Sequence, residues 1–129
     1  VLSREKGVEV IGDVKCSNRL FEGIAEAGGK PVMWKTGHSL IKNKMKTDGA
    51  ALAGEMSGHV FFADKFFGYD DALYAALRLL EIISSTGKTI PQLLEGVPPA
   101  VSTPEIRVDC PETIKFPVVE LVKEKLGKE

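Results

Sequence analysis

Cysteine and long apolar runs are scarce in this sequence, and each shortage excludes a class of protein. Only two of the 129 residues are cysteines, Cys16 and Cys110, and they lie far apart and form no Cys-x-x-Cys pair. The spacing therefore indicates neither a disulfide framework nor a thiolate metal site, and we expect two reduced, structural thiols. The longest apolar run is too short to cross a bilayer, and the amino terminus lacks the pattern of a secretion signal, so we expect a cytoplasmic location.

An excess of charge of one sign is also missing. Seventeen basic residues oppose eighteen acidic ones, which gives a formal net charge of −1 at pH 7. No overall field would therefore hold a nucleic acid or an anionic membrane. With 43% hydrophobic and 27% charged residues, the composition is typical of a globular protein, and 129 residues suffice for one domain with a core. Because the chain begins with Val1 and not with methionine, we expect a segment of a longer protein.

The apolar pattern predicts strands and helices that alternate along most of the chain. We expect strands at 8–14, 31–34, 50–53 and 60–63, and helices between Ser17 and Gly28, from Gly37 to about Lys46, at 71–84 and at 112–127. Helical crossovers before the third strand imply parallel neighbours, whereas the short connection between the third and fourth strands predicts an antiparallel pair. The predicted fold class is α/β: a three-layer-type domain with a mixed four-stranded sheet, its last strand antiparallel, and helices packed on it.

Polar residues and glycines mark where the helices begin and end. We expect Ser17 to cap the first helix and Asp70 to cap the third, which Gly87 ends. The third helix carries a broad apolar face suited to covering a sheet, made of Leu73, Ala76, Leu77, Leu80 and Ile83. Beyond Gly87 several prolines break the chain, which predicts a linker before the final amphipathic helix.

The residues from Gly54 to Val60 carry the most chemistry in the chain. They place a carboxylate (Glu55), a hydroxyl (Ser57) and an imidazole (His59) within five positions, and two glycines let the backbone turn sharply. A carboxylate accepts hydrogen bonds from two neighbouring hydroxyls, a serine donates and accepts, and a histidine moves a proton near neutral pH. This pattern favours a loop that recognises a sugar. The alternative is a tight turn whose polar side chains cap the backbone and face water.

Two further side chains are candidates for binding. Lys15 follows the first strand, where side chains of an open α/β sheet reach the ligand crevice. Its alternative is an ordinary lysine on the solvated surface. His38 stands at the start of a helix, where free amide groups and the positive end of the dipole favour an anion such as phosphate. Its alternative is a residue that packs on a neighbour.

A different chemistry would use His38, Glu55 and His59 together. Two histidines and one carboxylate are an acceptable catalytic zinc set, so a small metal-dependent hydrolase stays open. The sequence has no helical His-x-x-x-His pair, which argues against it. A dinucleotide site is not indicated, because the glycines near residues 23–29 follow a helix and form no Gly-x-Gly-x-x-Gly.

Four motifs stand in an order and at a spacing that a known family shares: Asp13-Val14-Lys15-Cys16-Ser17, Trp34-Lys35-Thr36-Gly37-His38-Ser39, Gly54-Glu55-Met56-Ser57-Gly58-His59 and Ser102-Thr103-Pro104-Glu105. Together they resemble the α-D-phosphohexomutase family, which contains bacterial phosphomannomutase/phosphoglucomutase. The resemblance implies that residues 1–98 are the third, sugar-recognition domain of such an enzyme, and that residues 99–129 are a linker and the first helix of the next, C-terminal domain, truncated. Met56 stands where the phosphoglucosamine mutase branch has glutamine, so the chain resembles the mannose/glucose branch.

The resemblance also implies a reaction and roles for five residues. Enzymes of this family interconvert the 1- and 6-phosphates of a hexose, here mannose or glucose, through a bisphosphate that turns around in the site. By resemblance, Glu55 and Ser57 hydrogen-bond the 3- and 4-hydroxyls of the sugar. Lys15 and His38 contact sugar or phosphate oxygens. His59 is the expected catalytic general acid or base, and no metal ligand is expected in this chain.

Motifs of the family that are missing from the sequence define the expected cofactor and partners. The sequence has no Ser-His-Asn-Pro-like phosphoserine loop, no Asp-Gly-Asp-Gly-Asp-like magnesium loop and no Arg-x-Ser-Asn-Thr-like phosphate clamp. The resemblance assigns these, with Mg²⁺, to other domains of the same polypeptide, so the isolated chain is expected to be inactive and free of cofactors. The expected partners are a hexose phosphate and those domains. A stand-alone, non-catalytic sugar-binding or interaction module is the alternative.

Overall fold

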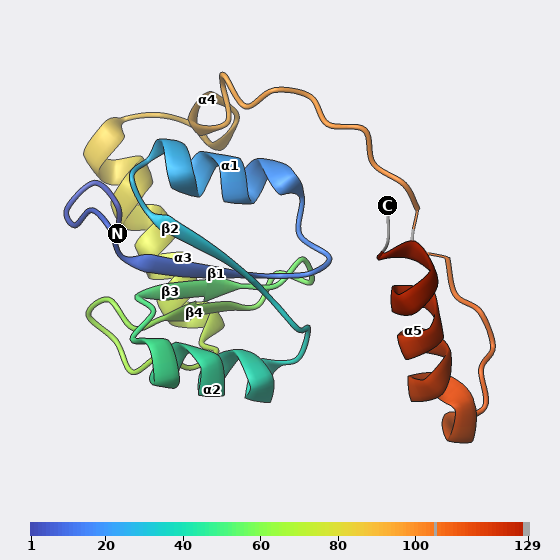
Figure 1. Cartoon of the computed structure of the whole chain (residues 1–129). Coiled ribbons are helices and arrows are strands. Elements are labelled where there is room, and N and C mark those ends of the chain that lie inside the picture. The colour runs from blue at the N-terminus through green and yellow to red at the C-terminus, as the bar shows by residue number, and fades with distance from the viewer. Residues whose placement is uncertain (105, 128–129) are drawn as a thin grey trace.

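The computed structural model describes residues 1–104 and 106–127, and strands and helices alternate in it as the sequence predicts (Figure 1). In chain order the elements are β1 Glu9–Asp13, α1 Asn18–Glu26, β2 Lys30–Trp34, α2 His38–Asp48, β3 Leu52–Gly54, β4 Val60–Phe62, α3 Ala72–Thr86, α4 Ile90–Leu93 and α5 Glu112–Leu126. The sheet has the order β2-β1-β3-β4, with β1 parallel to both its neighbours and β4 antiparallel to β3. The predicted α/β fold with a mixed four-stranded sheet is confirmed.

Local side-chain chemistry sets the helix ends. Ser17 caps α1, and its hydroxyl accepts a hydrogen bond from the amide of Arg19 at 3.3 Å, as predicted. The cap of α3 is Asp71, whose carboxylate accepts from the amide of Tyr74 at 2.8 Å, so the prediction of Asp70 is wrong by one residue. Asp70 is not free to cap, because its backbone bridges to Phe61 of β4 and its carboxylate binds a histidine described below.

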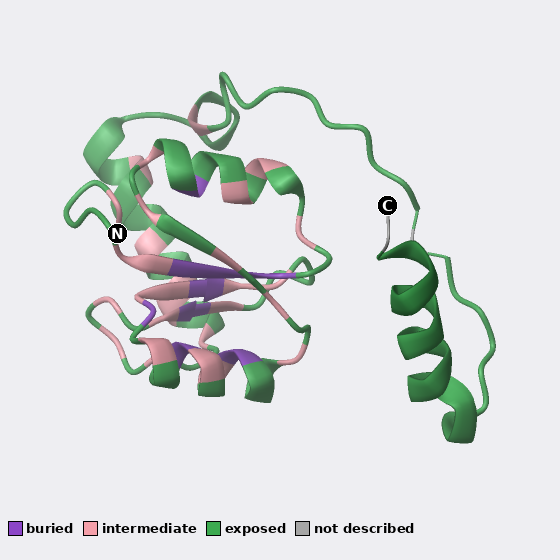
Figure 2. Cartoon of the chain, viewed as in Figure 1, coloured by how far each residue is buried: buried purple, intermediate pink, exposed green. Residues whose placement is uncertain are grey.

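The helices form a layer on each face of the sheet. Side chains alternate between the two faces of a strand, so odd-numbered residues of β1 share one face. That face packs against α2 and holds the main core, which consists of Ile11, Ile41, Met45, Ala50, Ala53 and Phe61. On the other face, α1 crosses β1 so closely that a Cβ added at Gly12 would lie 2.9 Å from the ring of Phe21. Buried residues accordingly concentrate in the strands and on the inner side of α2 (Figure 2).

Helix α3 covers β4 with a side that coincides only in part with the predicted one. Leu73 and Leu77 of the predicted face are 80% and 62% exposed, and Leu80 is exposed as well. The residues that turn toward the sheet include Arg78, whose guanidinium lies over the ring of Phe62. Of the predicted face, Ala76 does line the space between α3 and the strands and Ile83 is half-buried, so the prediction is wrong only for the three leucines.

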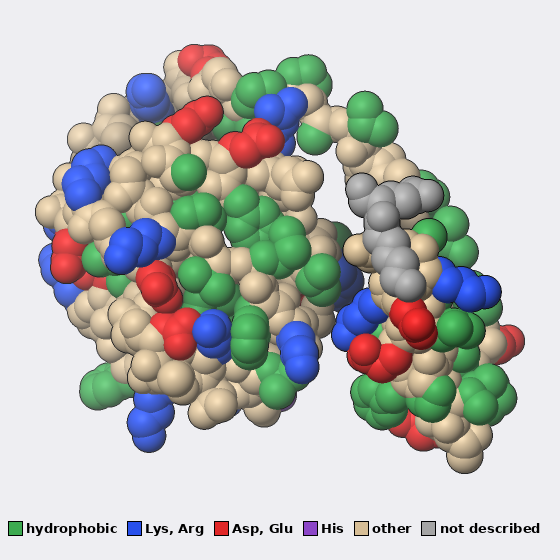
Figure 3. Space-filling view, viewed as in Figure 1, with side chains coloured by type: hydrophobic (Ala, Val, Ile, Leu, Met, Phe, Trp, Pro, Cys, Tyr) green, Lys and Arg blue, Asp and Glu red, His purple; other side chains and the backbone are tan. Residues whose placement is uncertain are grey.

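The part of the chain after α3 makes few contacts with the sheet. A short helix, α4, was not predicted from the sequence; it begins after Thr89 and has Pro91 in its first turn. The predicted final helix is present as α5, which has no buried residue and stands apart from the sheet (Figures 1 and 2). Hydrophobic side chains are visible on its surface between acidic and basic ones (Figure 3). None of the described helices combines the length and apolar character needed to cross a membrane.

Candidate functional site

A five-residue loop, 55–59, joins β3 to β4 at the edge where the parallel strands end. Two backbone hydrogen bonds close it, from the amide of Glu55 to the carbonyl of His59 and from the amide of Gly58 to the carbonyl of Glu55, both at 2.9 Å. Gly58 has a φ of 94°, a conformation that glycine adopts at no steric cost. The carboxyl ends of parallel strands are where open α/β sheets bind ligands. The loop therefore lies at the position predicted for a binding site.

Glu55 points to the start of α2. Its Oε1 accepts a hydrogen bond from the amide of Gly37 at 2.8 Å, and Gly37 is the residue that precedes the first residue of α2, His38. The chain's own carboxylate therefore occupies part of the positive helix end, where the sequence analysis expected an external anion. His38 is exposed, and its Nδ1 lies 3.4 Å from the hydroxyl of Ser39.

His59 pairs with an acidic residue that the sequence analysis assigned to another role. Its Nδ1 lies 2.7 Å from Oδ2 of Asp70, and 53% of the imidazole side chain remains exposed. A carboxylate at Nδ1 favours the tautomer that donates from Nδ1, which leaves Nε2 free to accept a proton. The sequence did contain a signal for this contact. Two adjacent aspartates, Asp70 and Asp71, precede α3, and only one of them can cap the helix, which leaves the other for a different partner.

Asp13 is a buried polar centre that the sequence analysis did not single out. Only 1% of its surface is exposed, and its carboxylate accepts hydrogen bonds from the thiol of Cys16 (3.1 Å), the hydroxyl of Thr36 (2.9 Å) and the amide of Met56 (3.3 Å). Burial alone would raise the pKa of Asp13, but these hydrogen bonds favour the charged form and leave the pKa below its ordinary value. Burial and the adjacent Asp13 carboxylate raise the pKa of Cys16 to about 11, so this thiol is neutral and weakly nucleophilic.

Lys15 and Ser57 complete the set of five predicted site residues. Lys15 is exposed and, together with Met56 and Thr103, lines an open groove of about 700 Å³. Ser57 is exposed, and its hydroxyl makes no hydrogen bond to any described residue, so it is available to a ligand.

The structure thus joins Glu55 to the start of α2 and places Lys15 beside the loop. It turns His59 toward Asp70, and no hydrogen bond or ion pair links His38 to His59 among the described residues.

A metal centre is not assembled from these side chains. Within residues 1–104 and 106–127, no group of three His, Cys, Asp or Glu residues is arranged to hold a metal ion. His38, Glu55 and His59, the zinc set considered from the sequence, bind Ser39, Gly37 and Asp70 respectively. The geometry therefore gives the hydrolase alternative no support.

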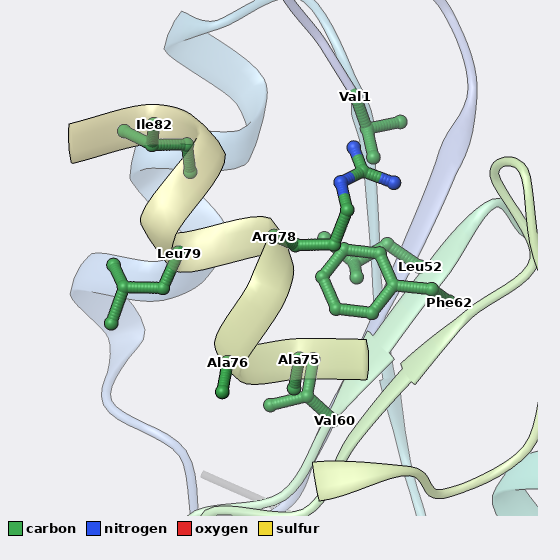
Figure 4. Close-up of a pocket in the computed structure, with 9 residues that line it drawn as sticks. All are labelled: Val1, Leu52, Val60, Phe62, Ala75, Ala76, Arg78, Leu79 and Ile82. Atoms are coloured by element: carbon green, nitrogen blue, oxygen red, sulfur yellow. The ribbon is translucent and has the colours of Figure 1, made fainter. Parts of the chain in front are cut away.

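The cavity in Figure 4 lies away from the loop chemistry. It has a volume of about 440 Å³ and separates α3 from β3 and β4. Its lining is Val1, Leu52, Val60, Phe62, Ala75, Ala76, Arg78, Leu79 and Ile82. Eight of these nine residues are apolar, and the arginine is paired with Asp64 at 3.0 Å. The cavity is therefore a gap in packing with no group suited to catalysis.

Known proteins resemble this chain in sequence and in structure. A family model described as phosphoglucomutase/phosphomannomutase, alpha/beta/alpha domain III, matches residues 2–101. The chain is 52% identical over 123 residues to a phosphomannomutase/phosphoglucomutase of Pseudomonas syringae pv. tomato, an alignment that covers 95% of this chain and 26% of that protein. It is 51% identical over 112 residues to a phosphoglucomutase of Neisseria gonorrhoeae, covering 87% of this chain and 24% of that protein.

A solved structure gives the same result. The crystal structure of a phosphoglucomutase/phosphomannomutase family protein from Burkholderia thailandensis is 55% identical and matches with a TM-score of 0.73. The match covers 80% of this chain and 22% of that one. The chain thus spans about a quarter of the length of the curated relatives it matches.

Proposed function

This chain belongs to the phosphoglucomutase/phosphomannomutase family, and we propose that it is the sugar-recognition domain of a phosphohexomutase. The reaction is the reversible interconversion of the 1- and 6-phosphates of mannose or glucose through a bisphosphate. The observation that carries the proposal is the convergence of polar groups at one sheet edge. There the loop 55–59, the start of α2 and the connection after β1 meet through hydrogen bonds to Glu55 and Asp13.

Glu55 and Ser57 recognise two neighbouring sugar hydroxyls. Oε1 of Glu55 is held by Gly37, which fixes the carboxylate and leaves its second oxygen able to accept from a hydroxyl. The exposed hydroxyl of Ser57 can donate to one sugar oxygen or accept from another. The 3- and 4-hydroxyls occupy similar places when the sugar is turned end for end. One carboxylate and one hydroxyl therefore serve both orientations of the bisphosphate.

His59 transfers the proton. Asp70 holds Nδ1 and orients the ring, so that Nε2 is the atom that takes a proton from the attacking hydroxyl or returns one to the leaving oxygen. A carboxylate partner also stabilises the imidazolium that forms in the first of these steps. The half-exposed ring can reach a substrate without a change in the fold.

Lys15 and His38 bind the anionic part of the substrate. Lys15 is exposed beside the groove at Met56, and an ammonium group there can contact phosphate oxygens. His38 is the first residue of α2, where the free amides and the helix dipole add to any positive charge on the ring.

The rest of the reaction needs groups outside this chain. The described residues offer no site that fits Mg²⁺, so no step is assigned to the metal here. We propose that Mg²⁺ and the phosphoryl-carrying residue belong to other domains of the same polypeptide, and that these domains and a hexose phosphate are the partners of this chain. Because metal and cations stabilise most of the charge in phosphoryl transfer, the isolated chain should not turn over. A cytoplasmic location belongs to the same proposal and is supported by two free cysteines.

The test is phosphomutase activity of the full-length protein on mannose 1-phosphate and glucose 1-phosphate. Glu55→Ala and Ser57→Ala should each lower kcat/KM about tenfold to a hundredfold, because a lost hydrogen bond to a sugar hydroxyl costs about 1–3 kcal/mol. His59→Ala should lower kcat by about 10²-fold or more, as expected for a general acid or base. Ser84→Ala, an exposed serine of α3, is the matched control and should keep wild-type kinetics.

Two results would contradict the proposal in different ways. If the full-length protein is active and its Glu55, Ser57 and His59 variants match the wild type, the loop is structural. If the full-length protein turns over no hexose phosphate but binds one in calorimetry, the result favours the non-catalytic sugar-binding module.

A further inference from the structure

We propose that Asp13 is a positioning residue of the sugar site: its buried carboxylate holds the loop 55–59, the start of α2 and the connection after β1 in one arrangement. Asp13 touches no ligand in this view and acts through the loop. The inference rests on the proposed function only in naming what the loop binds.

The two carboxylate oxygens of Asp13 accept hydrogen bonds from different donors. Oδ1 accepts from the amide of Met56 and from the thiol of Cys16, and Oδ2 accepts from the hydroxyl of Thr36. These three donors come from the three segments that carry the proposed binding residues: Met56 from the loop, Cys16 from the connection beside Lys15, and Thr36 from the turn before α2. One carboxylate therefore fixes the relative positions of segments that are far apart in sequence.

The bond to Met56 matters most for recognition. Met56 lies between Glu55 and Ser57, the two residues proposed to bind sugar hydroxyls. Glu55 has its own tie to Gly37, whereas Ser57 has no side-chain hydrogen bond within the described residues. The position of the Ser57 hydroxyl thus depends on the backbone that Asp13 anchors.

Stability alone is a poor reason for this carboxylate. Asp13 forms no ion pair in the described part of the chain, so neutral donors compensate the loss of hydration of a charge that is almost fully buried. Burying a charge with polar partners is often no more stabilising than an apolar residue of similar size. Such a group does, however, fix the geometry of the donors around it.

The experiment compares Asp13→Asn with Asp64→Asn in the full-length protein. Asp64 is also a carboxylate with a lowered pKa, but it pairs with Arg4 and Arg78 near α3, away from the loop. Asp13→Asn should lower kcat/KM about tenfold, mainly by raising KM, because a misplaced hydroxyl weakens substrate and transition state alike. Asp64→Asn should leave kcat/KM within about twofold.

A double-mutant cycle with Ser57→Ala separates positioning from general destabilisation. Once the Ser57 hydroxyl is gone, its placement no longer matters, so the effects of Asp13→Asn and Ser57→Ala should combine to less than their product. Asp64→Asn and Ser57→Ala should combine as independent changes. Independent effects for Asp13→Asn, or unchanged kinetics, would overturn the proposal.

A second readout does not depend on turnover. Alkylation of Cys16 at pH 8, followed by peptide mass spectrometry, should be at least about threefold faster in Asp13→Asn, because the negative charge that disfavours the thiolate is gone. Cys110 is exposed and has no contact with Asp13, so its rate is the internal control. If the full-length protein shows no mutase activity, the proposed function fails, and the Cys16 rate still tests whether Asp13 holds the connection after β1. An unchanged rate overturns it.

Thr36→Val is the milder variant if Asp13→Asn does not fold. It keeps the charge and the volume and removes one donor to Oδ2. It should lower kcat/KM about threefold and show the same non-additivity with Ser57→Ala. Full additivity in this pair would also contradict the proposal.

Discussion

The sheet is packed very differently under α2 and under α3. Under α2 lie the fully buried side chains of Ile11, Ile41 and Phe61. Under α3 lies a cavity of about 440 Å³, and no residue of α3 is buried (Figures 2 and 4). The helix that begins at the candidate site therefore rests on the well-packed face. A site built on the well-packed layer keeps its geometry while the strands under α3 remain loosely covered.

The largest contrast is expected between Phe61 and Leu77. Phe61→Ala should lower the free energy of unfolding by about 3–5 kcal/mol, because it leaves a cavity in the packed face. Leu77→Ala, on the exposed side of α3, should change it by no more than about 0.5 kcal/mol. Urea denaturation followed by circular dichroism measures both. Similar losses would mean that the outer side of α3 is as tightly packed as the core under α2.

Substitutions at Gly12 and Gly54 test how tightly the face of the sheet opposite α2 is covered, near α1 and near α3 respectively. The two glycines are register partners in β1 and β3. A Cβ at Gly12 would lie 2.9 Å from Phe21, whereas at Gly54 the nearest atom is the carbonyl oxygen of His59 at 3.8 Å. Gly12→Ala should therefore cost about 1–3 kcal/mol of stability, and Gly54→Ala less than about 1 kcal/mol. Thermal unfolding gives the ranking, and a reversed ranking would contradict this account.

Lowering the pH should reduce the free energy of unfolding through two carboxylates, Asp13 at the candidate site and Asp64 beside α3. Burial raises the pKa of Asp64, but its hydrogen bond from Arg78 and the charges of Arg4 and Arg78 outweigh burial, so the pKa lies below its ordinary 3.8, as it does for Asp13. A carboxylate with a lowered pKa in the folded state stabilises the protein fully above about pH 5. This stabilisation is lost as the pH falls through 3.8 and then through the lower folded-state pKa.

The sign of that dependence can be checked in variants. Asp13→Asn and Asp64→Asn should each flatten the fall in unfolding free energy between about pH 5 and pH 2, at a cost of about 1 kcal/mol at neutral pH for each hydrogen bond lost. Urea midpoints over this range are the measurement. Curves parallel to the wild type would show that the two carboxylates titrate normally.

The smallest effect should come from filling the cavity. Ala76 lines it, and leucine is a good helix former, so Ala76→Leu should raise stability by up to about 1 kcal/mol. Ala72→Leu adds the same atoms on α3 outside the cavity and should have almost no effect. A scan of Tm values separates them. Equal Tm values would show that solvent or relaxation already fills the gap.

Local signals in the sequence were sufficient for the elements of the fold. Ser17 caps α1 as predicted, and Gly87 ends α3 in the left-handed conformation that favours glycine. The short connection at 55–59 correctly gave an antiparallel pair, because a few residues cannot cross over a sheet. Helix α4 was missed, since a proline in a first turn looks like a chain breaker unless its capping residue, Thr89, is considered.

The candidate site was only half accessible from sequence. Glu55, Ser57 and His59 are close in the chain, so their loop could be found by inspection. Their supporting partners, Asp13 and Asp70, are 43 and 11 residues away from the groups they hold, and no periodic pattern links such pairs. The three leucines of α3 were placed wrongly for a similar reason, because the residue that lies over Phe62 is Arg78, whose ion-pair partner Asp64 is 14 residues away in the chain.

The bond between Glu55 and the amide of Gly37 also bears on which molecules are kept out. A helix start with open amides would attract any small anion, including free phosphate. Here a fixed negative charge already sits at that point, so a free anion approaching the amide meets electrostatic repulsion first. A neutral sugar ring meets no such repulsion and can donate its hydroxyls to the same carboxylate. The contact therefore makes this helix start less attractive to free anions than one whose amides are all open.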